Sequence, residues 1–148
     1  MLDLEPSLVI GVPEIDAQHK VLFEEVASFE AAVNAHLPYR FREFLTYLQM
    51  YARTHFEAEE RLMRDVGYPL LAAHIHEHSD FKRRLQSLVP KWEVESDSPA
   101  FVLAVHGLLH FWLADHVTVS DKRLQAFLRT ADSTPLSDKP STTRRRGR

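Results

Sequence analysis

The sequence contains no cysteine, and only 4 of its 148 residues are glycine. The absence of cysteine excludes disulfide bonds, thiolate metal ligands and a cysteine nucleophile. Any bound metal ion must therefore be held by imidazole and carboxylate groups. The scarcity of glycine, together with 45% hydrophobic and 26% charged residues, is typical of a globular domain and excludes a fibrous or largely disordered chain.

Long hydrophobic runs are also missing. The longest apolar stretches, at residues 101–105 and 108–114, are short or contain a histidine, whereas a helix that crosses a bilayer needs roughly 20 apolar residues. The first residues lack the basic region and the apolar run of a secretory signal. We therefore expect a cytoplasmic protein that does not associate with a membrane.

There is no excess of positive charge on the body of the chain. The net charge is -3, and residues 131–148 carry five basic and two acidic residues, which leaves about -6 on the rest. A negatively charged body argues against nucleic acid as a partner. The tail at 131–148 has almost no apolar residues to bury, so we expect it to be a disordered basic segment.

Apolar residues recur at helical spacing in four segments, each bounded by residues that start or stop helices. We expect the first helix to begin with Asp16 as its N-cap and to end before Pro38. The second is expected to end at Gly67. The third should have Pro69 in its first turn and end at Pro90.

A polar linker at 91–98 precedes the fourth predicted helix, which ends near residue 128. Residues 1–15 contain two prolines and a glycine, a pattern typical of an extended arm that packs on the body. Because the loops between the four helices are short, we predict an all-α fold, an antiparallel up-down four-helix bundle with this N-terminal arm, over residues 1–130.

Nine residues are histidine, and helical spacing brings five of them to inward faces together with two carboxylates. His55 and Glu59 lie four residues apart, so they project from one face about 6 Å apart along the axis. Seven such groups exceed the needs of one tetrahedral zinc and indicate two first-row metal ions, such as iron or manganese. The candidate ligands are His19, His55, Glu59, His74, His78, His116 and Asp121.

A single inward histidine is usually a hydrogen-bonded core residue rather than a ligand. Five unpaired imidazoles with two carboxylates would carry a desolvation cost of several kcal/mol that no obvious lysine or arginine relieves. A metal centre removes this difficulty. The other four histidines have ordinary surface or helix-end positions and are not expected to bind metal; they are His36, His76, His106 and His110.

The spacing of His116 and Asp121 does not fit a regular helix. Five residues on an ideal α-helix place two side chains about 140° apart, so both cannot point equally toward the core. We predict a local widening of the fourth helix, such as one π-type turn, between these two residues.

The order and spacing of the candidate ligands resemble the hemerythrin family over roughly residues 10–128. Three segments carry the resemblance to bacteriohemerythrins: GVPEIDAQHKVL at 11–22, HFEAEERLMRDVGYP at 55–69 and WLADHVTVSDKRL at 112–124. The resemblance implies a four-helix bundle that holds two iron ions and binds dioxygen.

The resemblance also implies how the ligands divide between the two irons. His74, His78 and His116 are expected to bind one iron, and His19 and His55 the other. The two irons would be bridged by Glu59, Asp121 and a solvent-derived oxygen. Dioxygen would bind at the iron with two histidines, in an apolar pocket whose expected lining is Leu22, Phe56, Trp112, Leu113 and Val117.

The expected function is reversible oxygen binding for carriage, storage or delivery, without catalysis. One alternative is a di-iron enzyme that reduces peroxide or nitric oxide, although the Glu-x-x-His pairs of ferritin-like enzymes are absent from the sequence. A second is an oxygen or redox sensor that acts on a protein partner, which the sequence does not identify. A zinc hydrolase is disfavoured because no His-Glu-x-x-His motif is present.

Overall fold

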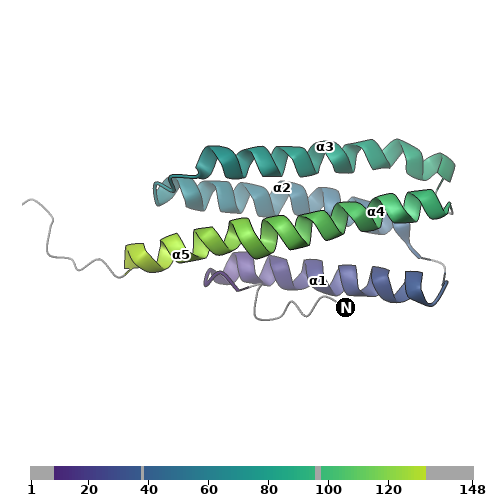
Figure 1. Cartoon of the computed structure of the whole chain (residues 1–148), viewed down its shortest axis with the longest axis horizontal. Coiled ribbons are helices and arrows are strands. Elements are labelled where there is room, and N and C mark those ends of the chain that lie inside the picture. The colour runs from purple at the N-terminus through teal and green to yellow at the C-terminus, as the bar shows by residue number, and fades with distance from the viewer. Residues whose placement is uncertain (1–8, 38, 96–97, 133–148) are drawn as a thin grey trace, which may run out of the picture.

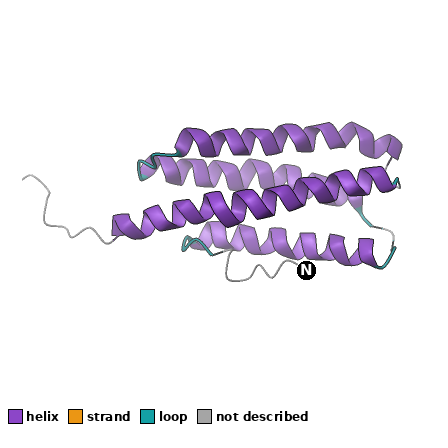
Figure 2. Ribbon diagram, in the orientation of Figure 1, coloured by secondary structure: helices purple, strands orange, loops and turns teal. Residues whose placement is uncertain are grey.

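The computed structural model describes residues 9–37, 39–95 and 98–132, and within these ranges it consists of helices and short connections without a β-strand (Figure 2). Residues 1–8 of the predicted arm and residues 133–148 of the predicted tail lie outside the described residues. The helical elements are α1 (Pro13–Asn34), α2 (Phe41–Asp65), α3 (Leu71–Glu95), α4 (Pro99–Phe111), the π-helix η2 (Trp112–Ser120) and α5 (Asp121–Asp132).

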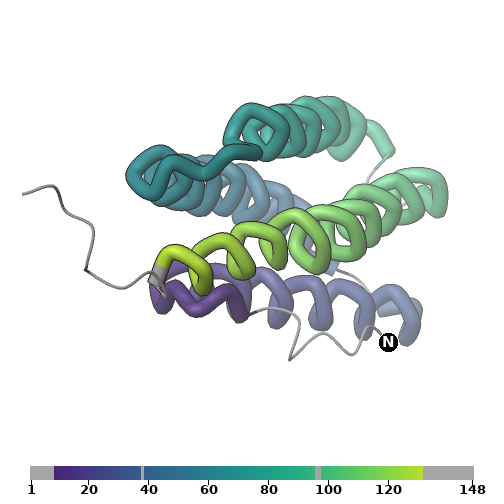
Figure 3. Tube along the Cα trace, turned by 60° about the vertical axis from the view of Figure 1, so that its left-hand side comes forward, coloured from purple at the N-terminus to yellow at the C-terminus, as the bar shows by residue number. Residues whose placement is uncertain are grey.

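The elements form an up-down four-helix bundle, as predicted. Elements α4, η2 and α5 follow one another without a break and make up the fourth helix of the bundle (Figure 1). Each helix runs antiparallel to the next along the chain, and α1 and the fourth helix lie side by side in both views (Figures 1 and 3). The inward faces of all four helices therefore meet along one central axis.

The interior of the bundle contains two apolar clusters with the candidate ligands between them. The larger cluster includes Phe29 and Phe44, whose rings stack with centroids 5.5 Å apart. The smaller cluster joins Ile10 and Ile15 to Met63 and Leu124. Because Ile10 is buried and residues 9–12 are not helical, this part of the predicted arm does pack on the body.

The predicted start of the first helix is wrong. The helix begins at Pro13, and Val12 is its N-cap. Proline suits the first helical position because its φ is already near the helical value and its missing N–H would have no partner there. Asp16 lies in the first turn instead, where its carboxylate accepts hydrogen bonds from the backbone N–H groups of Ile10 and Gly11 at 2.7 and 3.1 Å.

The predicted end of the third helix at Pro90 is also wrong, because α3 continues through this proline to Glu95. The helix therefore includes much of the predicted linker at 91–98. Proline removes one backbone hydrogen bond from a helix, but packing on both sides of it holds the helix together. Leu88 is buried before it, and Trp92 packs on the larger cluster after it, with the Arg42 guanidinium 4.6 Å from the Trp92 ring.

The predicted widening of the fourth helix is confirmed, and it is longer than one turn. Nine residues, Trp112–Ser120, form the π-helix η2, and the N–H of Asp121 donates to the carbonyl of His116 five residues earlier. A π-helix has more residues per turn than an α-helix. Its wider turn brings His116 and Asp121 to the same inward face.

The fourth helix is also apolar enough to cross a membrane by length and composition alone. An 18-residue window within Pro99–Ala131 has a mean hydropathy of 1.4, and 44% of that window is buried inside the bundle. A core helix of a soluble protein passes the same test. Within the bundle this helix carries the buried side chains of His116 and Asp121.

Candidate metal centre

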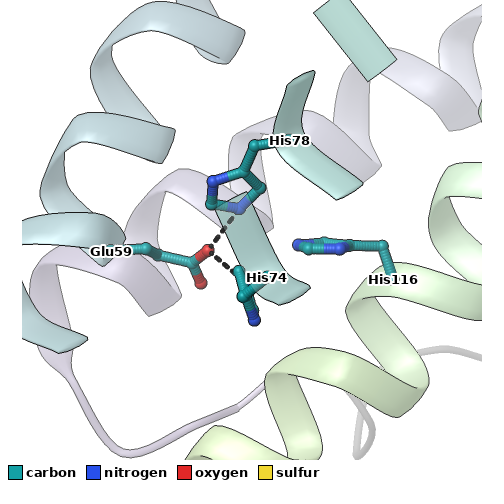
Figure 4. A group of neighbouring side chains, drawn as sticks. All are labelled: Glu59, His74, His78 and His116. Atoms are coloured by element: carbon teal, nitrogen blue, oxygen red, sulfur yellow. Dashed lines mark hydrogen bonds and ion pairs between the residues drawn. The ribbon is translucent and has the colours of Figure 1, made fainter. Parts of the chain in front are cut away.

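The structure brings all seven candidate ligands together in the interior of the bundle. Every one of them has an exposed fraction of 3% or less. Figure 4 shows Glu59 of α2 facing two histidines of α3, with His116 approaching from the fourth helix. The seven residues fall into two compact groups that share Glu59. One group is Glu59, His74, His78 and His116, and the other is His19, His55, Glu59 and Asp121.

Each carboxylate presents one oxygen to each group of histidines. Oε2 of Glu59 lies 3.2 Å from His74 Nε2 and 3.1 Å from His78 Nε2, while its Oε1 lies 3.6 Å from His55 Nε2. A carboxylate placed in this way can bind two cations at once.

Asp121 has the same arrangement on the other side of the centre. Its Oδ1 lies 3.3 Å from His74 Nε2 and 3.1 Å from His116 Nε2. Its Oδ2 lies 3.2 Å from His19 Nε2. The two carboxylates therefore link a group of three histidines to a group of two.

Three histidines are oriented by hydrogen bonds from their outward ring nitrogens. Nδ1 of His78 contacts Glu60 at 3.0 Å, and Nδ1 of His116 contacts Glu77 at 2.6 Å. Nδ1 of His55 contacts the side-chain oxygen of Gln18 at 2.8 Å. Sequence reasoning missed these three partners. Each of the three is next in the chain to a candidate ligand, but this adjacency does not show which way its side chain points.

The outward hydrogen bonds determine which atom each imidazole presents to the centre. Carboxylate oxygens accept hydrogen bonds, so the Nδ1 atoms of His78 and His116 donate outward. In a neutral imidazole the remaining nitrogen, Nε2, then carries a lone pair. That lone pair faces a carboxylate oxygen, and two lone pairs repel unless a proton or a metal cation lies between them.

Several inward atoms are buried without a hydrogen bond. They include Nε2 of His55 and of His116, Oε1 of Glu59 and both carboxylate oxygens of Asp121. Buried polar atoms ordinarily have partners, and leaving one without a partner costs about 1–3 kcal/mol. Two metal cations bound between the imidazoles and the carboxylates would satisfy all of these atoms, so the residues fit a two-metal centre.

The pKa values of two ligand histidines move in opposite directions. Burial lowers the pKa of His55 to about 4, although the Glu59 charge opposes this shift. Burial also tends to lower the pKa of His74, but the carboxylates of Asp121 and Glu59, 3.3 and 3.2 Å from its Nε2, outweigh burial and raise that pKa to about 10. In the metal-free protein, His74 therefore holds a proton beside the two carboxylates, where a cation would bind.

The two carboxylates remain ionised. Burial and their mutual repulsion raise the pKa of Glu59, but the surrounding imidazoles outweigh both effects and hold it well below its usual value. The pKa of Asp121 is lowered in the same way, chiefly by His116 against the effect of burial. Ionised carboxylates with neutral imidazoles are the ligand set that first-row divalent metals bind.

The five residues expected to line an oxygen pocket are all buried in the larger apolar cluster, next to the candidate ligands. Phe56 stacks on the ring of His78 with centroids 3.9 Å apart, and Trp112 stacks on the ring of His116 at 3.7 Å. Leu22, Leu113 and Val117 are each 1% exposed or less. Tyr51 of α2 is also buried, and its ring stacks on His55 at 4.6 Å.

The remaining four histidines lie outside the buried cluster. His36 and His76 are exposed, and His36 has a positive φ of 52° at the end of the first helix. His106 lies 3.8 Å from Glu30 on the outer surface, and the ring of His110 is 6.4 Å from that of His106.

Comparison with known proteins gives the same family for the whole bundle. The chain is 29% identical over 135 residues to a bacteriohemerythrin of Pseudomonas aeruginosa, which covers 91% of this chain and 86% of the relative. It is 26% identical over 119 residues to a bacteriohemerythrin of Clostridium acetobutylicum, with 76% and 90% covered. No solved structure matches the chain. The family model described as "Hemerythrin HHE cation binding domain" matches residues 10–128, and the chain belongs to the hemerythrin family.

Proposed function

We propose that this protein binds dioxygen reversibly at a non-haem di-iron centre. One observation carries the proposal: two groups of histidines of unequal size share two buried carboxylates. Unequal groups give two metal positions with different numbers of protein ligands. The position with fewer ligands is the one that can accept an external molecule.

In this proposal His74, His78 and His116 would hold one iron, and His19 and His55 would hold the other. Glu59 and Asp121 would each offer one oxygen to each metal position, together with a solvent-derived oxygen. When bound, the two irons supply an open coordination position and the two electrons that oxygen binding requires. The protein fixes the ligand geometry through the outward hydrogen bonds of its histidines, which orient the imidazole rings.

The apolar side chains beside the two-histidine group give the site its reversibility. Leu22, Leu113 and Val117 exclude water, and they offer no proton that could drive the release of a reduced oxygen species. The ring of Phe56 closes the space above His78. A dry pocket without an acidic side chain in its lining favours the return of oxygen unchanged over its reduction.

The ligand set favours binding over catalysis. Five imidazoles and two carboxylates stabilise oxidised iron less than the carboxylate-rich sets of ferritin-like enzymes. The proposal is therefore a carrier, store or delivery protein rather than an enzyme that reduces peroxide or nitric oxide. Signalling to a protein partner and the cytoplasmic location remain predictions from the sequence.

The test is anaerobic loading with ferrous iron followed by cycles of oxygen addition and removal. Reversible oxygen binding predicts a visible absorption band that appears with oxygen, disappears when oxygen is removed and returns over repeated cycles. Rapid irreversible oxidation that releases peroxide would contradict oxygen carriage. Continuous turnover of peroxide or nitric oxide by the loaded protein would instead identify an enzyme.

A further inference from the structure

Two buried aromatic side chains beside the metal centre carry polar hydrogens that the proposed function does not use. Tyr51 precedes His55 by four residues in α2, and Trp112 precedes His116 by four residues in η2. The Tyr51 ring is nearly parallel to the His55 ring, at 15° and 4.6 Å. The Trp112 ring is nearly parallel to the His116 ring, at 14° and 3.7 Å.

The two rings lie on the same side of the ligand layer. α2 and the fourth helix run in the same direction (Figure 1), so a residue about one turn before the ligand on either helix lies on the same side. Leu22 follows His19 on the antiparallel helix α1, which places it on this side as well. This is the side of the apolar pocket proposed for oxygen.

Neither polar group has a hydrogen-bond partner. The hydroxyl of Tyr51 and the indole nitrogen of Trp112 are both buried without a hydrogen bond, although each residue is at least 97% buried. The indole is close enough to lower the pKa of the phenol, but no hydrogen bond joins the two groups. A buried donor without a partner is energetically unfavourable, so a ligand that accepts its hydrogen bond would be favoured.

The side chain of Tyr51 is a phenol, which is protonated at neutral pH because its ordinary pKa is about 10. A protonated phenol donates a hydrogen bond, and an indole N–H can only donate. The pocket therefore presents two donors from two helices, Tyr51 beside His55 of the two-histidine group and Trp112 beside His116 of the three-histidine group.

We propose that Tyr51 and Trp112 form a donor pair that holds the outer atom of a small ligand bound at the two-histidine position. This inference rests on the proposed function, because the inner atom of the ligand would bind to the iron. The ligand class is a small molecule or anion whose free end accepts hydrogen bonds, such as dioxygen or azide. The pair makes an otherwise apolar pocket selective for ligands whose outer atom accepts hydrogen bonds.

The test compares azide binding to the iron-loaded, oxidised protein with binding to two variants. Tyr51→Phe removes the hydroxyl and keeps the ring that stacks on His55. Tyr47→Phe is the matched control, because it removes a hydroxyl from a partly buried tyrosine one turn earlier on the same helix. Circular dichroism and iron content establish that each variant folds and holds two irons.

The donor pair predicts that Tyr51→Phe raises the dissociation constant of azide about tenfold, the range expected for a hydrogen bond to a charged group, while Tyr47→Phe stays within twofold of wild type. Ultraviolet resonance Raman gives a second readout: azide should shift the indole N–H signal of Trp112 and leave that of Trp92, the only other tryptophan, unchanged.

Equal azide affinity in Tyr51→Phe and wild type would overturn the donor pair. Failure of the loaded wild-type protein to bind azide would overturn it as well, while oxygen cycling would still test the proposed function. A protein that takes up no iron would overturn both.

Discussion

The ligand histidines differ in what their outward nitrogens contact. His78 and His116, both in the three-histidine group, donate to the carboxylates of Glu60 and Glu77. His55, in the two-histidine group, contacts the neutral amide of Gln18. A carboxylate partner makes an imidazole more basic and a stronger ligand. We therefore expect the three-histidine position to hold its iron more tightly.

The first prediction concerns ligation itself. His78→Ala removes one buried imidazole from the three-histidine group and should reduce the iron content below two per chain, measured by metal analysis after loading. His76→Ala is the control, because His76 is exposed on the same helix two residues away. Full iron content in His78→Ala, with helix content unchanged, would refute the ligand assignment.

The second prediction concerns the outward hydrogen bond of His116. Glu77→Gln removes the carboxylate that accepts from Nδ1, so iron should be lost to a chelator about 10–100 times more readily. Glu57→Gln makes the same change of charge at an exposed position of α2 and should behave as wild type. If both variants release iron at the same rate, the contact between Glu77 and His116 does not support the metal.

The individual metal ligands could be predicted from the sequence, but the side chains that hydrogen-bond to the ligand histidines could not. His55 and Glu59 are polar residues on an apolar helical face, so spacing alone identifies them. The side chain of Gln18 or Glu60 lies near the edge of such a face, where either solvent or the core is available to it. Only the packing of neighbouring helices decides which way it turns. Tyr51 was overlooked because an inward tyrosine resembles any other core aromatic residue.

Among the helices, the fourth shows how a ligand requirement shapes a whole element. Two ligands five residues apart cannot share one face of an α-helix, and this conflict between spacing and geometry was visible in the sequence. The length of the π-helix could not be predicted. The conflict requires only one extra residue, whereas η2 extends over Trp112–Ser120. The widening also places Trp112 and Val117 in the apolar cluster.

In helix α3, by contrast, tertiary packing overrides a local sequence signal. A proline is a strong local stop signal, yet Pro90 does not end this helix because Leu88 and Trp92 are held by tertiary contacts on either side. Local rules predict the boundary, and packing overrides them. The same holds at Asp16, where the predicted cap residue instead binds the segment before the helix.

The third prediction follows from this proline. Pro90→Ala should restore one backbone hydrogen bond on an exposed face of α3 and remove a ring that clashes with the preceding turn, raising the free energy of unfolding by about 1–3 kcal/mol. Chemical denaturation measures the change, and Lys91→Ala, at the exposed neighbouring position, is the control. A loss of stability in Pro90→Ala would mean that the bundle needs the proline's geometry.

The whole molecule couples metal binding to folding. The interior contains five imidazoles and two carboxylates whose inward atoms lack hydrogen bonds in several cases, so the metal-free bundle carries buried polar groups that the metal would satisfy. A metal that binds only the folded state stabilises it by mass action. The fold itself could be predicted from four apolar stripes and short loops, because a bundle is the simplest way to bury them.

The fourth prediction is that iron raises the melting temperature. Binding at about a thousand times the dissociation constant contributes about 4 kcal/mol, which corresponds to roughly 8–16 °C for a chain of this size. Differential scanning calorimetry with and without ferrous iron, under anaerobic conditions, measures the shift. Magnesium is the control, since it prefers oxygen ligands and should leave the transition unchanged. The same melting temperature with and without iron would contradict this coupling.

The most direct measurement of the central claim is anomalous X-ray diffraction at the iron edge from crystals of the iron-loaded protein. The di-iron proposal predicts two iron peaks roughly 3.5–4 Å apart, as in other two-metal sites, both between Glu59 and Asp121. It also predicts three histidines around one peak and two around the other. A single iron peak, or two peaks away from these carboxylates, would contradict the proposal.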